Sequence, residues 1–268
     1  MYDIGSSLGL PAPAVERYRT AAAALSDPAG LQRLHYFGER GWFADWGTHT
    51  EDVALQIKSV TVPGADGQLP QRRDVSKRVS RSLPLPQYVP QFGYVSLFPL
   101  IMRLLPAGGD AAAVAALAAA ADGSDAGSGG GQGAELLLQQ LSLLTDPSLL
   151  WSPHGLRSLA TTASLYKKRN TADDPPYWRG QIWLNINYLV LRALSYYATA
   201  AGADSEAGLA AAAAHEQLRS ALLTSVVGGY KRNGYLYEQY DDETGRGTSS
   251  HPFTGWTALI TLIAAQEY

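Results

Sequence analysis

Stretches rich in alanine and leucine alternate along this chain with stretches rich in tryptophan, tyrosine and aspartate. The first kind recurs at 12–25, 184–201, 206–227 and 254–266. The second kind occupies 35–50, 151–183 and 234–247. Alanine and leucine are strong helix formers, and no clear run of alternating strand residues accompanies them. The pattern therefore predicts an all-α fold of helical hairpins whose functional residues lie on loops at one end.

Three further segments complete this outline. A helix is expected from Gly93 to about residue 105, kinked or restarted at Pro99, because proline cannot donate a helical hydrogen bond. Residues 61–92 hold five prolines and a basic cluster, and they are expected to form an irregular, solvated excursion. The Gly/Ser-rich spacer at 122–133 is expected to be a flexible insertion in a helical hairpin. Thr254 is the expected N-cap of the last helix.

The composition excludes several classes of function. The net charge is −3, with no basic stripe, so nucleic acid is not an expected partner. There is no cysteine, and the five histidines are dispersed without metal-ligand spacing, so neither a metal nor another cofactor is expected. Because no apolar run approaches the roughly 20 residues of a membrane span, we expect no membrane contact from this chain itself.

Three loops combine aromatic rings with carboxylates, amides and histidine, at 42–49, 173–187 and 235–256. Ring faces stack on the C–H faces of sugars, polar side chains bind hydroxyl groups, and a carboxylate can transfer a proton. This mixture favours a carbohydrate site. Aromatic core packing, or another ligand, remains the alternative on spacing alone.

Several long motifs follow one another in an order that resembles the C-terminal catalytic region of the processing α-glucosidases of glycoside hydrolase family 63. They are "GWFADWGTHT" (41–50), "FGYVSLFPLIMRLL" (92–105), "LLWSPHGLRSLATTASLY" (149–166), "DPPYWRGQIWLNINYL" (174–189), "YLYEQYDDETGRG" (235–247) and "HPFTGWTALI" (251–260). The resemblance covers nearly the whole chain. It implies an (α/α)₆ toroid that removes, with inversion and without a cofactor, the terminal α-1,2-linked glucose of the N-linked glycan Glc3Man9GlcNAc2. The implied place is the lumenal side of the endoplasmic reticulum membrane.

The resemblance also implies roles for single residues. Glu238 matches the general base of the family. The expected residues of the substrate pocket are Tyr177, Trp178, Arg179, Trp183, Tyr237 and Trp256. Asp45 is expected either to bind a glucose hydroxyl or to cap its own loop. Asp173 and Asp174 are expected to form a turn before Pro175.

One part of the family pattern is absent from this sequence. The general acid of the family is an aspartate in an "LDDYPR"-like motif, and no such string occurs here. We therefore expect residues 1–268 to be the C-terminal part of one toroid, with the base but without the acid. Because the acid is missing, the chain on its own is expected to release no measurable glucose from a triglucosylated glycan, and to be poorly soluble or molten. A non-catalytic glycan-binding module and a related α-glucosidase with another α-glucoside substrate are the alternatives.

Overall fold

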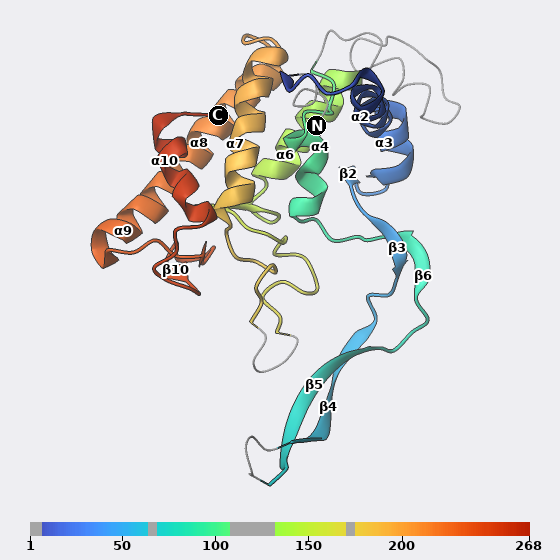
Figure 1. Ribbon diagram of the computed structural model, residues 1–268, viewed down its shortest axis with the longest axis vertical. Helices are drawn as coiled ribbons and strands as arrows, with labels where there is room; N and C mark the ends of the chain where they lie inside the picture. The colour runs from blue at the N-terminus through green and yellow to red at the C-terminus, as the bar shows by residue number, and fades with distance from the viewer. Residues whose placement is uncertain (1–6, 64–68, 108–131, 170–174) are drawn as a thin grey trace.

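The computed structural model describes residues 7–63, 69–107, 132–169 and 175–268. Its centre is an antiparallel pair of long helices, α7 (Leu184–Ala200) and α8 (Glu206–Leu222), with α6 (Gln132–Thr145) packed beside α8 (Figure 1). The predicted helices at 184–201 and 206–227 are confirmed to within a few residues, the second one ending in a π-helical turn, η2 (Leu223–Val227).

The spacing of apolar residues explains the position of these helices. In α7 the buried side chains recur every three or four residues, which places them on one face: Leu184, Asn187, Val190, Leu191, Ala193, Leu194 and Tyr197. Most of the buried residues in the first half of α8 are small: Ala207, Gly208, Ala211 and Ala214. Gly208 lies so close to the backbone before α8 that an added Cβ would fall 2.1 Å from the Gly202 carbonyl oxygen. Small residues therefore allow the close approach of α7 and α8.

The predicted helix at 12–25 is confirmed, and a second helix that was not predicted follows it. Helix α2 spans Ala12–Leu25 and α3 spans Pro28–His35, where the Asp27 side chain caps α3 by accepting a hydrogen bond from the Gly30 amide at 2.8 Å. Strands β1 (Tyr36–Phe37) and β2 (Trp42–Phe43) then form a short hairpin within the aromatic stretch at 35–50.

The helix predicted from Gly93 to about residue 105 is confirmed in part: it restarts near Pro99, as expected, but ends at Ile101. A 3-10 turn, η1 (Tyr94–Leu97), leads into α4 (Phe98–Ile101), and Pro99 lies at the start of α4, where its missing N–H is not needed. Near the C-terminus, α9 (Gly228–Asn233), η3 (Trp256–Leu259) and α10 (Ile260–Ala265) follow one another.

Thr254 is not the cap of the last helix. Gly255 precedes η3, and the Trp256 indole and the Thr257 hydroxyl fix the start of this segment by donating hydrogen bonds to the backbone carbonyls of Glu238 and Tyr237, at 2.8 and 2.7 Å. Contacts to the preceding loop therefore decide where the helix begins.

The all-α prediction is not confirmed, because the described chain also contains paired strands. Strand β4 (Val53–Val62) pairs with β5 (Gln71–Ser80) over ten residues, and β3 (Trp46–His49) pairs with β6 (Leu85–Tyr88). Figure 1 shows the β4–β5 ribbon extending away from the helices. The prediction of an irregular segment at 61–92 is wrong for the strands, whose β-branched residues favour extended backbone.

Part of the predicted spacer lies outside the described residues, namely 122–131. Gln132 and Gly133, which were also assigned to the spacer, belong to α6. Among the described helices none is both long and apolar enough to cross a membrane.

Candidate active site

Four separate segments of the chain are joined by short backbone bridges beside the N-terminus of α7. Gly93 pairs with Leu159, Arg157 pairs with Ile182, and Ile182 pairs with Tyr240. The amides of Ile182 and Tyr240 donate to each other's carbonyl oxygens at 2.8 and 3.0 Å. These bridges hold the loops that carry the sequence motifs in fixed relative positions.

The loop after residue 238 is a small hairpin made of β9 (Gln239–Tyr240) and β10 (Gly247–Thr248). Its turn is stabilised by Asp241, whose Oδ1 accepts hydrogen bonds from the amide and hydroxyl of Thr244 at 2.8 and 2.7 Å. Gly245 has a φ of +66° and closes the turn. The acids and glycines of the "DDETG" stretch are therefore partly explained by turn formation.

Glu238 lies just before this hairpin with its carboxylate held on both sides. The Tyr177 hydroxyl donates to Oε1, and the Ser249 hydroxyl donates to Oε2 at 2.7 Å. The backbone is held as well, because the Glu238 amide donates to the Ser250 carbonyl oxygen at 3.0 Å and the Trp256 indole donates to the Glu238 carbonyl oxygen. Glu238 is only 8 % exposed, so its side chain has a fixed position.

These contacts set the protonation state of the pair formed by Glu238 and Tyr177. Burial by itself raises the pKa of Glu238, but hydrogen bonds from Tyr177, Ser249 and Ser250 outweigh it and hold the pKa below its ordinary value of 4.5. The hydrogen bond to this carboxylate, together with burial, raises the pKa of Tyr177 to about 12. Near neutral pH Glu238 is therefore an ionised acceptor, as a general base requires.

Stacked aromatic rings form a wall beside Glu238. The indole of Trp178 lies flat on that of Trp183, with centroids 3.8 Å apart and an angle of 8°. The ring of Tyr177 meets Trp183 edge-on at 4.7 Å, and Trp256 lies 5.5 Å from Trp183. Trp183 is fully buried whereas Trp178 is 45 % exposed. Trp178 is therefore accessible to a ligand, and the buried Trp183 stacks against it on the core side.

Asp45 and Trp178 line the same cavity. A cavity of ≈ 460 Å³ is lined by Asp45, Tyr94 and Trp178, together with Ser158 and mostly apolar groups. Asp45 is exposed, so its carboxylate can reach a ligand in the cavity. This arrangement favours the ligand-binding alternative for Asp45.

Two expected pocket residues have other contacts. Arg179 donates to the backbone carbonyls of Lys168 and Pro175, at 2.8 and 3.3 Å, and so holds its own loop together. The Tyr237 ring packs against His251 at 4.7 Å. Its hydroxyl accepts a hydrogen bond from the Asn233 side chain at 3.4 Å. Asp173 and Asp174 lie outside the described residues.

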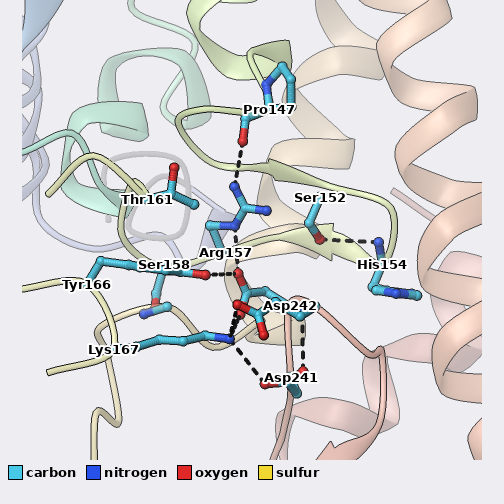
Figure 2. A network of polar contacts seen from close by, with 12 residues as sticks. Pro147, Ser152, His154, Arg157, Ser158, Thr161, Tyr166, Lys167, Asp241 and Asp242 are labelled. Atoms are coloured by element: carbon cyan, nitrogen blue, oxygen red, sulfur yellow. Dashed lines mark hydrogen bonds and ion pairs between the residues drawn. The ribbon is translucent and has the colours of Figure 1, made fainter. Parts of the chain in front are cut away.

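A buried ionic network connects the hairpin loop to the loop at 157–167, as Figure 2 shows. Asp242 is fully buried and accepts hydrogen bonds on Oδ2 from Arg157 Nε at 2.8 Å and from the Tyr166 hydroxyl at 2.5 Å. Lys167 Nζ lies 2.9 Å from the other oxygen of Asp242 and 3.4 Å from Asp241. Burial raises the pKa of Asp241, but hydrogen bonds from Thr244 and the nearby charge of Lys167 outweigh it and hold the pKa below its ordinary value. Both oxygens of Asp242 face cations, Arg157 on one side and Lys167 on the other.

Sequence reasoning missed Ser249 and this network. Arg157 and Asp242 are separated by 85 residues, so no local spacing reveals their contact. The only sequence features that hint at this network are the paired acids of "DDETG" and the basic residues Arg157 and Lys167 in a distant segment. They are a weak signal, because nothing in the sequence shows that the two segments meet. In the described part of the chain, no group of three potential metal ligands is close enough to hold an ion.

A buried, ionised carboxylate in a cluster of aromatic side chains, one of them an exposed tryptophan, is an arrangement that suits a glycoside hydrolase. The sequence profile of the "Glycosyl hydrolase family 63 C-terminal domain" matches residues 1–122 and 132–266. The chain therefore belongs to glycoside hydrolase family 63.

Relatives with names of their own agree with this assignment. The chain is 38 % identical over 253 residues to the mannosyl-oligosaccharide glucosidase GCS1 of Arabidopsis thaliana, and 37 % identical over 253 residues to alpha-glucosidase 2 of the same plant. Each match covers 94 % of this chain, but only 26 % and 28 % of the relatives. The chain thus spans about a quarter of the length of these relatives.

A solved structure shares the fold. The mannosylglycerate hydrolase of family 63 from Thermus thermophilus, in complex with Tris and D-glycerate, superposes with a TM-score of 0.50. The match covers 98 % of this chain and 41 % of that protein, at 17 % identity. At this identity the likeness concerns the fold alone.

Proposed function

We propose that this chain provides the general base and one wall of the sugar pocket in an inverting α-glucosidase. The observation that carries the proposal is the Glu238 carboxylate, which is buried and ionised between two hydroxyl donors beside the exposed face of Trp178. Membership of family 63 supports it.

In this reaction Glu238 removes a proton from a water molecule. The water oxygen attacks the anomeric carbon of glucose from the side opposite the glycosidic bond, and the proton passes to a Glu238 oxygen. A second carboxyl group, protonated and roughly 6.5–9.5 Å away, gives its proton to the departing oxygen. Asp241 and Asp242 face cations, so neither is assigned this role, and we assign the general acid to no residue of this chain.

The remaining pocket residues bind and orient the sugar. The exposed face of Trp178 stacks on the C–H face of the glucose ring, and Asp45 accepts a hydrogen bond from a hydroxyl across the ≈ 460 Å³ cavity. Trp183 and Trp256 fix Trp178 and Glu238 without touching the ligand. This division follows from burial, because Trp183 has no exposed surface.

The proposed substrate is the terminal α-1,2-linked glucose of the N-glycan precursor Glc3Man9GlcNAc2, processed in the lumen of the endoplasmic reticulum. The names of the relatives support this choice, because two of them, from Arabidopsis thaliana and Saccharomyces cerevisiae, are called mannosyl-oligosaccharide glucosidases. No cofactor takes part in the proposed reaction.

A chimera tests the substrate. This chain replaces the matching segment of the Arabidopsis mannosyl-oligosaccharide glucosidase, so that the relative supplies the rest of the protein. We expect glucose release from Glc3Man9GlcNAc2 and from the α-1,2-linked disaccharide, and little from α-1,3- or α-1,4-linked glucosides. Equal rates on all linkages would favour a different α-glucosidase. A folded chimera that binds the glycan without releasing glucose would favour a non-catalytic binding module.

A further inference from the structure

Ser249 has a backbone conformation that serine rarely adopts. Its φ is +66°, in the left-handed region, where the Cβ atom of an L-residue crowds its own backbone. Glycine or asparagine is the usual residue there. An unfavourable conformation at a residue that contacts a catalytic group is a reason to look for a function.

The strand register around Ser249 shows what this conformation does. Gln239 lies opposite Thr248 in the β9–β10 pair, so a regular ladder would place Ser249 opposite Glu238. Instead the Glu238 amide donates to the carbonyl oxygen of Ser250, one residue further along, at 3.0 Å. The second strand thus accommodates one extra residue, as in a β-bulge, and such bulges redirect side chains.

The redirected side chain reaches the proposed base. Ser249 Oγ lies 2.7 Å from Glu238 Oε2, while the Tyr177 hydroxyl donates to Oε1. Ser250 also donates to this carboxylate, so Ser249 belongs to a set of donors that holds the Glu238 side chain. Two hydroxyl donors on opposite oxygens also fix the rotation of the carboxylate plane.

We propose that Ser249 is a positioning residue for the Glu238 base, and that its left-handed backbone exists to direct its hydroxyl at Oε2. The proposal rests on the proposed function for its catalytic meaning, but its structural part can be tested without turnover. Ser249 acts through Glu238 and has no contact with the sugar in this account.

The titratable groups near this carboxylate limit the interpretation of a pH experiment. Tyr177, from the loop before α7, contacts Glu238 directly, and its raised pKa of about 12 keeps it protonated over the relevant range. His251 has its ring nitrogen Nδ1 3.3 Å from the carbonyl oxygen of Ser249. Asp241 and Lys167 lie beyond Tyr240 and pair with each other. A His251→Gln background controls for titration of the imidazole.

Three substitutions of Ser249 distinguish the effect of its hydroxyl group from the effect of its left-handed backbone conformation. Ser249→Ala and Ser249→Gly both remove the hydroxyl, but only glycine relieves the left-handed conformation. Ser249→Thr keeps the hydroxyl, although a β-branched residue makes that conformation less favourable. The melting temperature is therefore expected to rise or stay level for Gly and to fall for Ala and Thr.

The test measures the titration of Glu238 in the 268-residue chain by ¹³C NMR of its side-chain carboxyl, assigned from the signal that Glu238→Gln removes. We expect Ser249→Ala and Ser249→Gly to move the midpoint upward by about one pH unit, since each loses a hydrogen bond to a charged group. Ser249→Thr should keep the wild-type midpoint. An unchanged midpoint in both Ala and Gly variants, or a change in Ala alone, would overturn the proposal.

The same variants are then assayed with α-D-glucosyl fluoride, whose fluoride departs without a general acid. The acidic limb of the rate profile should move upward with the NMR midpoint, and turnover at neutral pH should fall roughly tenfold for both Ala and Gly. A wild-type chain that does not hydrolyse the fluoride would count against the proposed function. The NMR midpoints would still decide the role of Ser249.

Discussion

Hydroxyl groups, not cations, keep the Glu238 carboxylate ionised inside the loop cluster. Its two oxygens accept hydrogen bonds from Tyr177 and Ser249, and these contacts outweigh the effect of burial on its pKa. A neutral donor holds the carboxylate without the Coulombic attraction of a cation, which would lower its pKa and its basicity further. The site is therefore suited to accept a proton near neutral pH.

The Tyr177 hydroxyl should contribute stability that depends on pH. Because the pKa of folded Glu238 is lowered, this contribution is present above the ordinary value of 4.5 and is lost as the pH falls through the folded value. We expect Tyr177→Phe to lower the free energy of unfolding by about 1–2 kcal/mol at pH 7 and by less at pH 4. Urea unfolding at both pH values measures the difference.

Tyr188→Phe is the matched control for this measurement, because the Tyr188 hydroxyl donates to the backbone carbonyl of Glu267 at 2.9 Å. That acceptor does not titrate, so the effect of the control should be the same at both pH values. An equal loss for Tyr177→Phe at pH 7 and pH 4 would show that its hydroxyl does not stabilise the ionised form of Glu238.

Single residues show where sequence reasoning ends. The motifs singled out Glu238, Trp178 and Tyr177, and the structure brings all three together. Whether they act as proposed remains a prediction. Ser249 was missed because its role depends on an extra residue in a strand and on a left-handed φ. The local sequence, Ser249 followed by Ser250, indicates neither of them. Trp183 was expected to line the pocket, but it is fully buried and lies behind Trp178, against which it stacks.

At the level of elements, the network around Asp242 connects the hairpin loop to the loop after β8 (Gly155–Leu156). Arg157 also donates to the carbonyl oxygens of Pro147 and Leu149, at 2.8 and 3.1 Å, so one side chain joins three segments (Figure 2). Desolvation lowers the pKa of Lys167, but hydrogen bonds to Asp242 and Glu243 raise it above the ordinary 10.5 overall. Lys167 therefore stays charged over the whole physiological range.

Removing the central charge of this network should destabilise the fold strongly. Asp242→Asn leaves Arg157 and Lys167 beside each other without a buried carboxylate, and such changes cost about 3–5 kcal/mol. For a chain of this size the melting temperature should fall by roughly 10 °C. Differential scanning calorimetry measures it.

The control is Asp52→Asn, because Asp52 forms a solvent-exposed ion pair with Arg81 at 2.8 Å. Exposed pairs contribute about 0–1 kcal/mol, so its melting temperature should change by no more than about 3 °C. Similar small changes in both variants would show that the buried network is not needed for stability.

The strands show a second limit of sequence reasoning. The helices at 12–25 and 184–201 were predictable because their apolar residues recur with helical spacing and have strong local propensity. The β4–β5 ribbon was not, because both of its faces are mostly exposed: Ile57 is 73 % exposed and Leu55 is 50 % exposed. A strand without a buried face does not need alternating apolar and polar residues, so its sequence lacks the pattern from which strands are predicted. The Asp66–Gly67 pair in the sequence is a dipeptide typical of hairpin turns, and the sequence analysis did not use it.

At the level of the whole molecule, the buried core and the proposed site share one helix. The core surrounds α7 and draws on α4, α6, α8 and α10, whereas the described residues from 45 to 91 contribute none of its buried side chains. Trp183, at the N-terminal end of α7, is both a core residue and the support of Trp178. Packing of the core therefore fixes the aromatic wall directly.

The central claim is that Glu238 in this chain acts as a base on water that attacks glucose. The most direct measurement is hydrolysis of α-D-glucosyl fluoride by the 268-residue chain, followed by ¹H NMR, because the step needs the base but no general acid. We predict fluoride release with β-glucose as the first product, and a rate that Glu238→Gln lowers by roughly 10²–10⁴. No release by the wild-type chain, α-glucose as the first product, or equal rates for the wild-type and Glu238→Gln chains would contradict the account.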